Sequence, residues 1–126
     1  MGGIIQKSKP SRIETLKIES QFRPFVVMSN GPYKAERWLQ DVIVSETAPE
    51  KKLHPWEQAL GPVIEIIQMA ANGPSVVCDP FVGLGTTGVA ALSLGNSFLG
   101  CDIDPRTARE AQERLAEFSA AANVVT

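Results

Sequence analysis

The sequence predicts an α/β fold with a mostly parallel sheet in three layers. Residues 60–118 read in the order helix, strand, helix, strand, helix, which is typical of a parallel sheet covered by helices. The two strand candidates, SVVCD (75–79) and SFLGCDID (97–104), are short and begin with the β-rich, apolar residues of a buried parallel strand. A single helix separates them, so we expect a right-handed βαβ crossover.

The first fifty residues give weaker signals. Residues 1–20 combine mixed charge with weak periodicity, which predicts poor order, short strands or an edge segment. A strand is predicted over Phe25–Met28 because the turn signal SNGP (29–32) follows it. A second short strand is predicted over Asp41–Val44, and the polar run that follows (45–52) predicts a loop.

An amphipathic helix is predicted from about residue 60. Pro62 suits the first helical position, Glu65 suits the first turn, and NGP (72–74) ends the pattern. The apolar residues recur at helical spacing: Leu60, Val63, Ile64, Ile67 and Ala71.

Two further helices are predicted after the first strand of the pair. TTGVAALSLG (86–95) follows the first strand, with Gly95 as its C-cap, and DPRTAREAQERLAEF (104–118) follows the second. Asp104 suits the N-cap of the last helix and Pro105 its first position. Residues 119–126 are expected to be a loose tail.

Composition favours one soluble domain. The chain has 126 residues, 44% of them hydrophobic and 21% charged. No apolar run approaches the ~20 residues that span a bilayer, and no signal peptide is visible, so we expect no membrane partner and a cytoplasmic location. Two cysteines, Cys78 and Cys101, are too few for a disulfide scaffold and are interpreted as small buried hydrophobes. With His54 as the only histidine, no metal site is expected.

The charge distribution is uneven. Residues 1–37 carry seven Lys or Arg and three Glu, a net charge of +4, whereas residues 38–126 carry a net charge of −6. The first interpretation of the basic segment 1–37 is a solvated terminus. The second is a surface that binds phosphate or an acidic partner.

The junction between the first buried strand and its helix has the features of a nucleoside site. Gly83 and Gly85 would let a ligand approach the backbone, and the helix beginning at Thr86 offers unpaired N–H groups. Asp102, at the end of the second strand, can accept hydrogen bonds from both ribose hydroxyls. The alternative is a tight turn that only packs. A dinucleotide site is not favoured and a P-loop motif is absent.

The segment DPFVGLGTTGVAALSLGNSFLGCDID (79–104) resembles the cofactor motif of DNA amino-methyltransferases, which make N6-methyladenine or N4-methylcytosine. That family has D-P-F-x-G-x-G-T-T, followed by a strand ending G-x-[ED]-x-[DN]. LHPWEQAL (53–60) resembles the family segment H-P-x-x-x-x-L, with Ala59 where many relatives have proline. The resemblance covers about residues 20–118. It implies a partial Rossmann-like, S-adenosylmethionine-dependent methyltransferase fold over residues 21–118, in the permuted subgroup whose cofactor motif lies near the C-terminus.

The resemblance also implies which residues contact S-adenosylmethionine. Asp79 would face the methionine moiety, Asp102 the ribose and Ile103 the adenine. His54 and Trp56 would be lid residues, or else a helix-entry turn with a packing tryptophan. The implied contacts on the loop itself are Asp79, Phe81, Gly83, Gly85 and Thr86.

The family's catalytic motif, [DNS]-P-P-[YFW], holds the target amino group and stacks on the flipped base. The sequence contains no such tetrapeptide, and the nearest string, NGPY (30–33), is interpreted as a turn, with a degenerate catalytic motif as the alternative. The resemblance therefore implies the cofactor-binding half of a methyltransferase, acting on DNA through a complete enzyme, with a second polypeptide supplying the catalytic motif. A non-catalytic S-adenosylmethionine-binding module or a degenerate remnant is the alternative.

Overall fold

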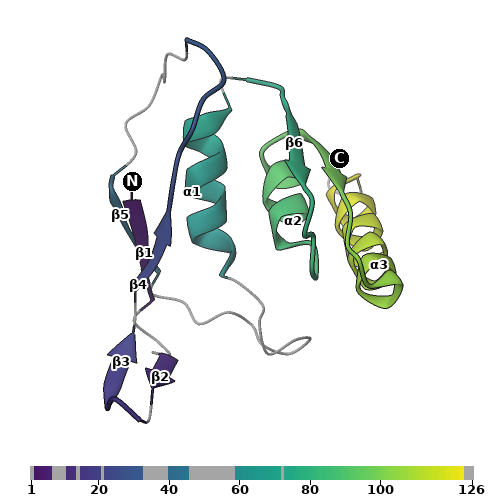
Figure 1. Cartoon of the computed structure of the whole chain (residues 1–126). Helices are drawn as coiled ribbons and strands as arrows, with labels where there is room; N and C mark the ends of the chain where they lie inside the picture. Colours follow the sequence, from purple (N-terminus) through teal and green to yellow (C-terminus); the bar gives the residue numbers. More distant parts are fainter. Residues whose placement is uncertain are drawn as a thin grey trace.

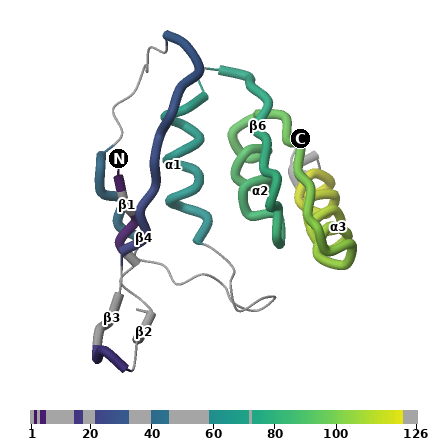
Figure 2. The backbone as a smooth tube through the Cα atoms, viewed as in Figure 1, coloured from purple at the N-terminus to yellow at the C-terminus, as the bar shows by residue number. Residues whose placement is uncertain are grey.

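The computed structural model describes residues 2–6, 11–13, 15–20, 22–32, 40–45, 59–71 and 73–123. Its helices lie side by side, and the strands of the described residues form three sheets, of which β2 and β3 make one (Figures 1 and 2). In chain order the elements are β1 (Gly2–Gln6), β2 (Ser11–Ile13), β3 (Ile18–Ser20), β4 (Phe22–Phe25), β5 (Val42–Ser45), α1 (Leu60–Ala70), β6 (Val76–Asp79), α2 (Thr86–Ser93), β7 (Ser97–Gly100) and α3 (Pro105–Asn123).

The N-terminal strands form a three-stranded sheet in the order β4-β1-β5. β1 runs antiparallel to β4 and parallel to β5. The sequence predicted poor order, short strands or an edge segment here. Short strands are present, but β1 is the middle strand of its sheet and not an edge. Gly2 lies so close to the Phe25 ring and the Asp41 carbonyl that a Cβ would come within 2.6 and 2.8 Å of them. This close packing was not apparent from a glycine-rich, weakly periodic stretch.

Two predicted strands are displaced along the chain. β4 covers Phe22–Phe25, not Phe25–Met28, because Phe25 already pairs with Gly2 at the start of β1. The apolar residues after it, Val26–Met28, are exposed. β5 begins one residue later than predicted, at Val42, and buries Ile43 and Ser45.

The predicted βαβ unit is present. β6 and β7 pair in parallel, with Val77 opposite Phe98, and α2 connects them. The core cluster lies on the helical side of this pair. Its buried members are Ile67 of α1 and Ala90 and Ala91 of α2, against which Val77, Phe98 and other partly buried side chains pack. The predicted α/β fold with a parallel strand pair is thus confirmed.

Small residues allow the three helices to pack closely. α2 contacts both α1 and α3, and α1 also contacts β5, so α1 lies between the N-terminal sheet and α2 (Figure 1). Gly88 faces α3, where a Cβ would come within 2.9 Å of the side chains of Leu115 and Phe98. The glycine therefore sets the distance between α2, α3 and β7.

The helix ends confirm some sequence expectations and correct others. The Asp104 side chain accepts a hydrogen bond from the Arg106 N–H (2.9 Å), which confirms it as the N-cap of α3. Pro62 is the third residue of α1 rather than the first, and α1 has no acidic residue in its first turn. Helix α3 continues to Asn123 instead of ending at residue 118, because the run SAAA favours helix over a loose tail.

The two cysteines were expected to be buried, and this is wrong. Both Cys78 and Cys101 are exposed free thiols. Cys78 alternates with Val77 along β6, so it points away from the core on which Val77 packs. None of the helices in the described part of the chain is both long and apolar enough to cross a membrane.

Candidate cofactor-binding site

The candidate site lies where β6 and β7 end, at their carboxyl edge. After Asp79 the chain forms the loop 80–85 and enters α2, and after Gly100 it reaches Asp102. Backbone hydrogen bonds join the segments that follow β6 and β7. The Cys101 N–H donates to the Asp79 carbonyl (3.1 Å), and the Val82 N–H donates to the Cys101 carbonyl (2.9 Å). The carboxyl edge of a parallel sheet is where α/β proteins bind ligands.

Asp102 holds the glycine loop against β7. Its Oδ2 accepts a hydrogen bond from the Gly83 N–H at 3.0 Å, and its Oδ1 accepts one from the Asp104 N–H at 3.0 Å. Hydrogen bonds from the backbone of Asp104, and next of Gly83, favour the ionised carboxylate and lower the pKa of Asp102 below its ordinary value of 3.8. Each carboxylate oxygen can accept a further hydrogen bond. Asp102 is thus an ionised acceptor with remaining capacity for hydroxyl donors.

The lowered pKa predicts a specific acid sensitivity. Ionised Asp102 stabilises the folded chain fully above pH 3.8, and this contribution is lost as the pH falls through the lower folded-state pKa. Asp102→Asn should therefore have a lower free energy of unfolding than the wild type at pH 6. This difference in unfolding free energy should become smaller below about pH 3.8. Urea unfolding of both proteins at pH 6 and pH 3 measures this difference. A difference in unfolding free energy that is the same at pH 3 as at pH 6 would contradict the role of the ionised carboxylate.

The two loop glycines have different environments. Gly83 has φ +51° and faces open space, with only the Phe81 carbonyl at 4.0 Å from an added Cβ. Gly85, with φ +79°, is buried, and an added Cβ would lie 3.5 Å from Ala111 and Leu115 of α3. Gly83 thus has the open backbone that the sequence predicted for ligand approach. At Gly85 the left-handed turn into α2 and the contact with α3 account for the glycine.

The other loop residues divide into a structural group and an exposed group. The Asp79 side chain accepts the Phe81 N–H at 2.9 Å and so fixes the start of the loop. Thr86, the first residue of α2, is buried. By contrast, the side chain of Phe81 is 84% exposed and that of Ile103 is fully exposed. They follow β6 and β7 respectively, so both exposed apolar side chains belong to the segments that leave the carboxyl edge of the strand pair.

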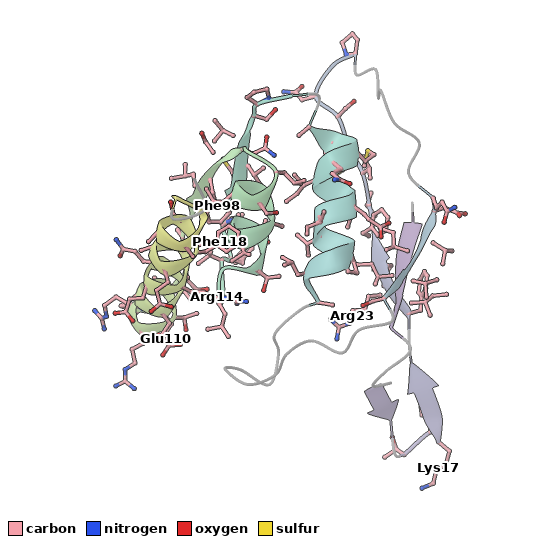
Figure 3. The ribbon with its side chains drawn as sticks, turned by 180° about the vertical axis from the view of Figure 1, so that it is seen from behind. Lys17, Arg23, Phe98, Glu110, Arg114 and Phe118 are labelled. Carbon is pink, nitrogen blue, oxygen red and sulfur yellow. The ribbon has the colours of Figure 1, made fainter. Side chains whose placement is uncertain are left out.

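Arg114 of α3 is a loop contact that the sequence did not indicate. Its Nη1 donates a hydrogen bond to the Leu84 carbonyl at 3.0 Å, across thirty positions of the chain. Figure 3 labels the Arg114 side chain. An arginine in a charged helix carries no local signal for such a contact. The proposed lid residues His54 and Trp56, and Tyr33 of the NGPY string, lie outside the described residues. Residues 30–32 of that string are exposed, and Gly31 has φ +103°.

The site combines an ionised acceptor at Asp102, an open backbone at Gly83 and the exposed apolar side chains of Phe81 and Ile103. Helix α2 follows the loop, and its first turn has no side-chain cap. Among the described residues, no group of three or more His, Cys, Asp or Glu side chains is placed to hold a metal ion.

Comparison with known proteins agrees with this geometry. A family model described as DNA methylase, of the N6/N4 type, matches residues 5–113. The type II methyltransferase M.HinfI of Haemophilus influenzae is 32% identical over 68 residues, covering 54% of this chain and 19% of the relative. M2.DpnII of Streptococcus pneumoniae is 37% identical over 62 residues, covering 49% of this chain and 23% of the relative.

Solved structures extend the similarity to the fold. The crystal structure of the M1.HpyAVI–SAM complex superposes with a TM-score of 0.64 at 26% identity and covers 90% of this chain and 60% of that one. The chain matches only 19% and 23% of the length of these two curated relatives. Since the family model covers most of its residues, the chain belongs to the N6/N4 family of DNA methylases.

Proposed function

We propose that this chain binds S-adenosylmethionine at the carboxyl edge of β6 and β7. In this proposal it is the cofactor-binding half of a site-specific DNA methyltransferase, which transfers a methyl group to an exocyclic amino group of adenine or cytosine. The catalytic [DNS]-P-P-[YFW] motif would come from a polypeptide segment outside these 126 residues. The enzyme would act in the cytoplasm.

The observation that carries the proposal is the Asp102–Gly83 hydrogen bond. It places an ionised acceptor beside the open backbone of the loop, so a ribose and a methionine-like chain could bind side by side. Asp102 would accept the ribose hydroxyls, while Phe81 and Ile103 offer exposed apolar surface to the purine. His54 and Trp56 would complete the cover, as the resemblance implies.

In this proposal the chain's own residues bind and orient. Bound S-adenosylmethionine supplies an electrophilic methyl group. Asp79 would orient the methionine end, since its position at the loop start is fixed by the Phe81 N–H. Orienting the reactive group toward the incoming base is the part of catalysis that a binding half can contribute.

Binding of S-adenosylhomocysteine tests the proposal directly. Calorimetry of the 126-residue chain should show saturable, one-to-one heat, with adenosine binding more weakly because it lacks the amino-acid end. The absence of heat at millimolar S-adenosylhomocysteine would reject the cofactor site. Equal affinity for adenosine and S-adenosylhomocysteine would reject the role of the loop at Asp79.

A further inference from the structure

Leu84 lies between two glycines whose backbone is left-handed. Gly83 has φ +51° and Gly85 has φ +79°. Glycine adopts left-handed and right-handed conformations about equally readily, so steric repulsion does not fix the backbone on either side of Leu84. The orientation of the peptide unit that joins Leu84 to Gly85 therefore depends on its hydrogen bonds.

Both polar groups of that peptide unit have partners, and the partners come from different parts of the chain. The Gly85 N–H donates to the Val82 carbonyl at 2.8 Å, within the loop itself. The Leu84 carbonyl accepts a hydrogen bond from Arg114 Nη1 at 3.0 Å, and this bond reaches the loop from α3. A hydrogen bond from a guanidinium is charge-assisted and stronger than one between neutral groups. Arg114 is therefore the long-range contact that orients this peptide unit.

The packing of α3 brings Arg114 to the loop. Ala111 is 2% exposed, and an added Cβ on Gly85 would lie 3.5 Å from both Ala111 and Leu115. Residues three and four apart share one face of a helix, so Ala111, Arg114 and Leu115 lie on the face of α3 that is turned to the loop. Arg114 is half-buried there, whereas Arg109 of the same helix is exposed. The contact with Leu84 is thus part of the interface between α3 and the loop.

We propose that Arg114 is a positioning residue for the amino-acid end of the cofactor. By holding the Leu84 carbonyl on the side of α3, it keeps the loop in the geometry that binds the methionine part of S-adenosylmethionine. This inference rests on the function proposed above and adds a residue that acts through the loop backbone. The ribose acceptor has a separate support, because Asp102 also accepts the Asp104 N–H at 3.0 Å. Loss of Arg114 should therefore weaken binding of the amino-acid end more than binding of the nucleoside.

Two ligands compared on one variant separate this role from a general effect on stability. In calorimetry, Arg114→Leu should bind S-adenosylhomocysteine at least tenfold more weakly than the wild type, whereas the affinity for adenosine should change less than twofold. When only a fraction of the chains holds the loop in the binding geometry, the apparent Kd rises by the inverse of that fraction. Arg114→Lys keeps a charged donor for a single carbonyl and should recover most of the lost affinity. Arg109→Leu, which removes an exposed arginine from α3, is the matched control and should bind both ligands as the wild type does.

Hydrogen exchange of backbone amides measures the loop without a ligand. In Arg114→Leu the Gly85 N–H, which donates to the Val82 carbonyl, should exchange at least tenfold faster than in the wild type. The Ser97 N–H donates to the Ser75 carbonyl at the opposite end of β6 and β7, and its exchange rate should be the same in both proteins. A general loss of stability would instead accelerate the exchange of both amides.

Each result supports the positioning role of Arg114 or overturns it. If Arg114→Leu binds S-adenosylhomocysteine as the wild type does, the role is rejected and the cofactor proposal stands. Equal losses of affinity for the two ligands, or equal acceleration of the two amides, would assign Arg114 to folding alone. No recovery of affinity in Arg114→Lys would reject the hydrogen bond to the Leu84 carbonyl as the cause. If the wild type itself binds no S-adenosylhomocysteine, the cofactor site is rejected and this inference with it.

Discussion

Incubated alone with duplex DNA and labelled S-adenosylmethionine, the purified chain is expected to transfer no methyl group above background. Transfer to an exocyclic amine needs a group that holds the amine and an aromatic floor for the extruded base. The sequence lacks the [DNS]-P-P-[YFW] motif that supplies both in related enzymes. Adding a methylase segment that carries the motif should raise labelling from background to a multiple-turnover signal.

The controls separate the explanations of a negative result. When the chain in the reconstituted pair carries Asp102→Ala, labelling of DNA at limiting S-adenosylmethionine should fall sharply. This result would show that the methyl transfer depends on the cofactor site of this chain. Labelling by the chain alone would show that NGPY (30–33) acts as a catalytic motif. If S-adenosylhomocysteine binds but no motif-bearing segment restores labelling, the chain is a binding module or a remnant.

Asp102→Ala should weaken S-adenosylhomocysteine binding by roughly tenfold or more, because it removes a charged acceptor for two hydroxyls. It also removes the partner of the Gly83 N–H, so the loop loses its link to β7. Calorimetry at pH 7 measures the change. Glu113→Ala, which removes the same charge from an exposed position on α3, is the matched control and should bind as the wild type does.

An unchanged affinity in Asp102→Ala would place the ligand elsewhere. Asp102→Asn refines the test, since the amide keeps the shape of the side chain and one acceptor oxygen but loses the charge. We expect it to bind between the wild type and the alanine variant. Circular dichroism of all variants excludes unfolding as the cause.

The sequence was most informative where one local rule decides the structure. The βαβ unit follows from the alternation of strand-like and helix-like segments along the chain. The start of α3 follows from Asp104 and Pro105. The lengths and places of β1 and β4 depend on pairing across the chain, such as Gly2 with Phe25, and local patterns do not contain that information. Tertiary pairing therefore decided the elements that the sequence placed less well.

The candidate site shows the same division. Asp102 and Gly83 were expected from the residue pattern, and Ile103 from the resemblance alone; the structure brings Asp102 and Gly83 into direct contact and leaves Ile103 exposed. The Arg114–Leu84 contact and the packing of Gly85 on α3 were not expected, since both depend on where α3 lies. The exposure of both cysteines was mispredicted because the apolar strands implied a cover on both faces.

The hydrogen bond between Asp102 and the Gly83 N–H has a consequence for the thermodynamics of binding. The acid expected to receive the ribose also holds the loop through the Gly83 N–H, and Arg114 holds it through the Leu84 carbonyl. A ligand would therefore bind to a loop backbone and an Asp102 carboxylate that are already in position. The loop would then lose little conformational entropy on association. Affinity differences among analogues should then appear mainly in their dissociation rates.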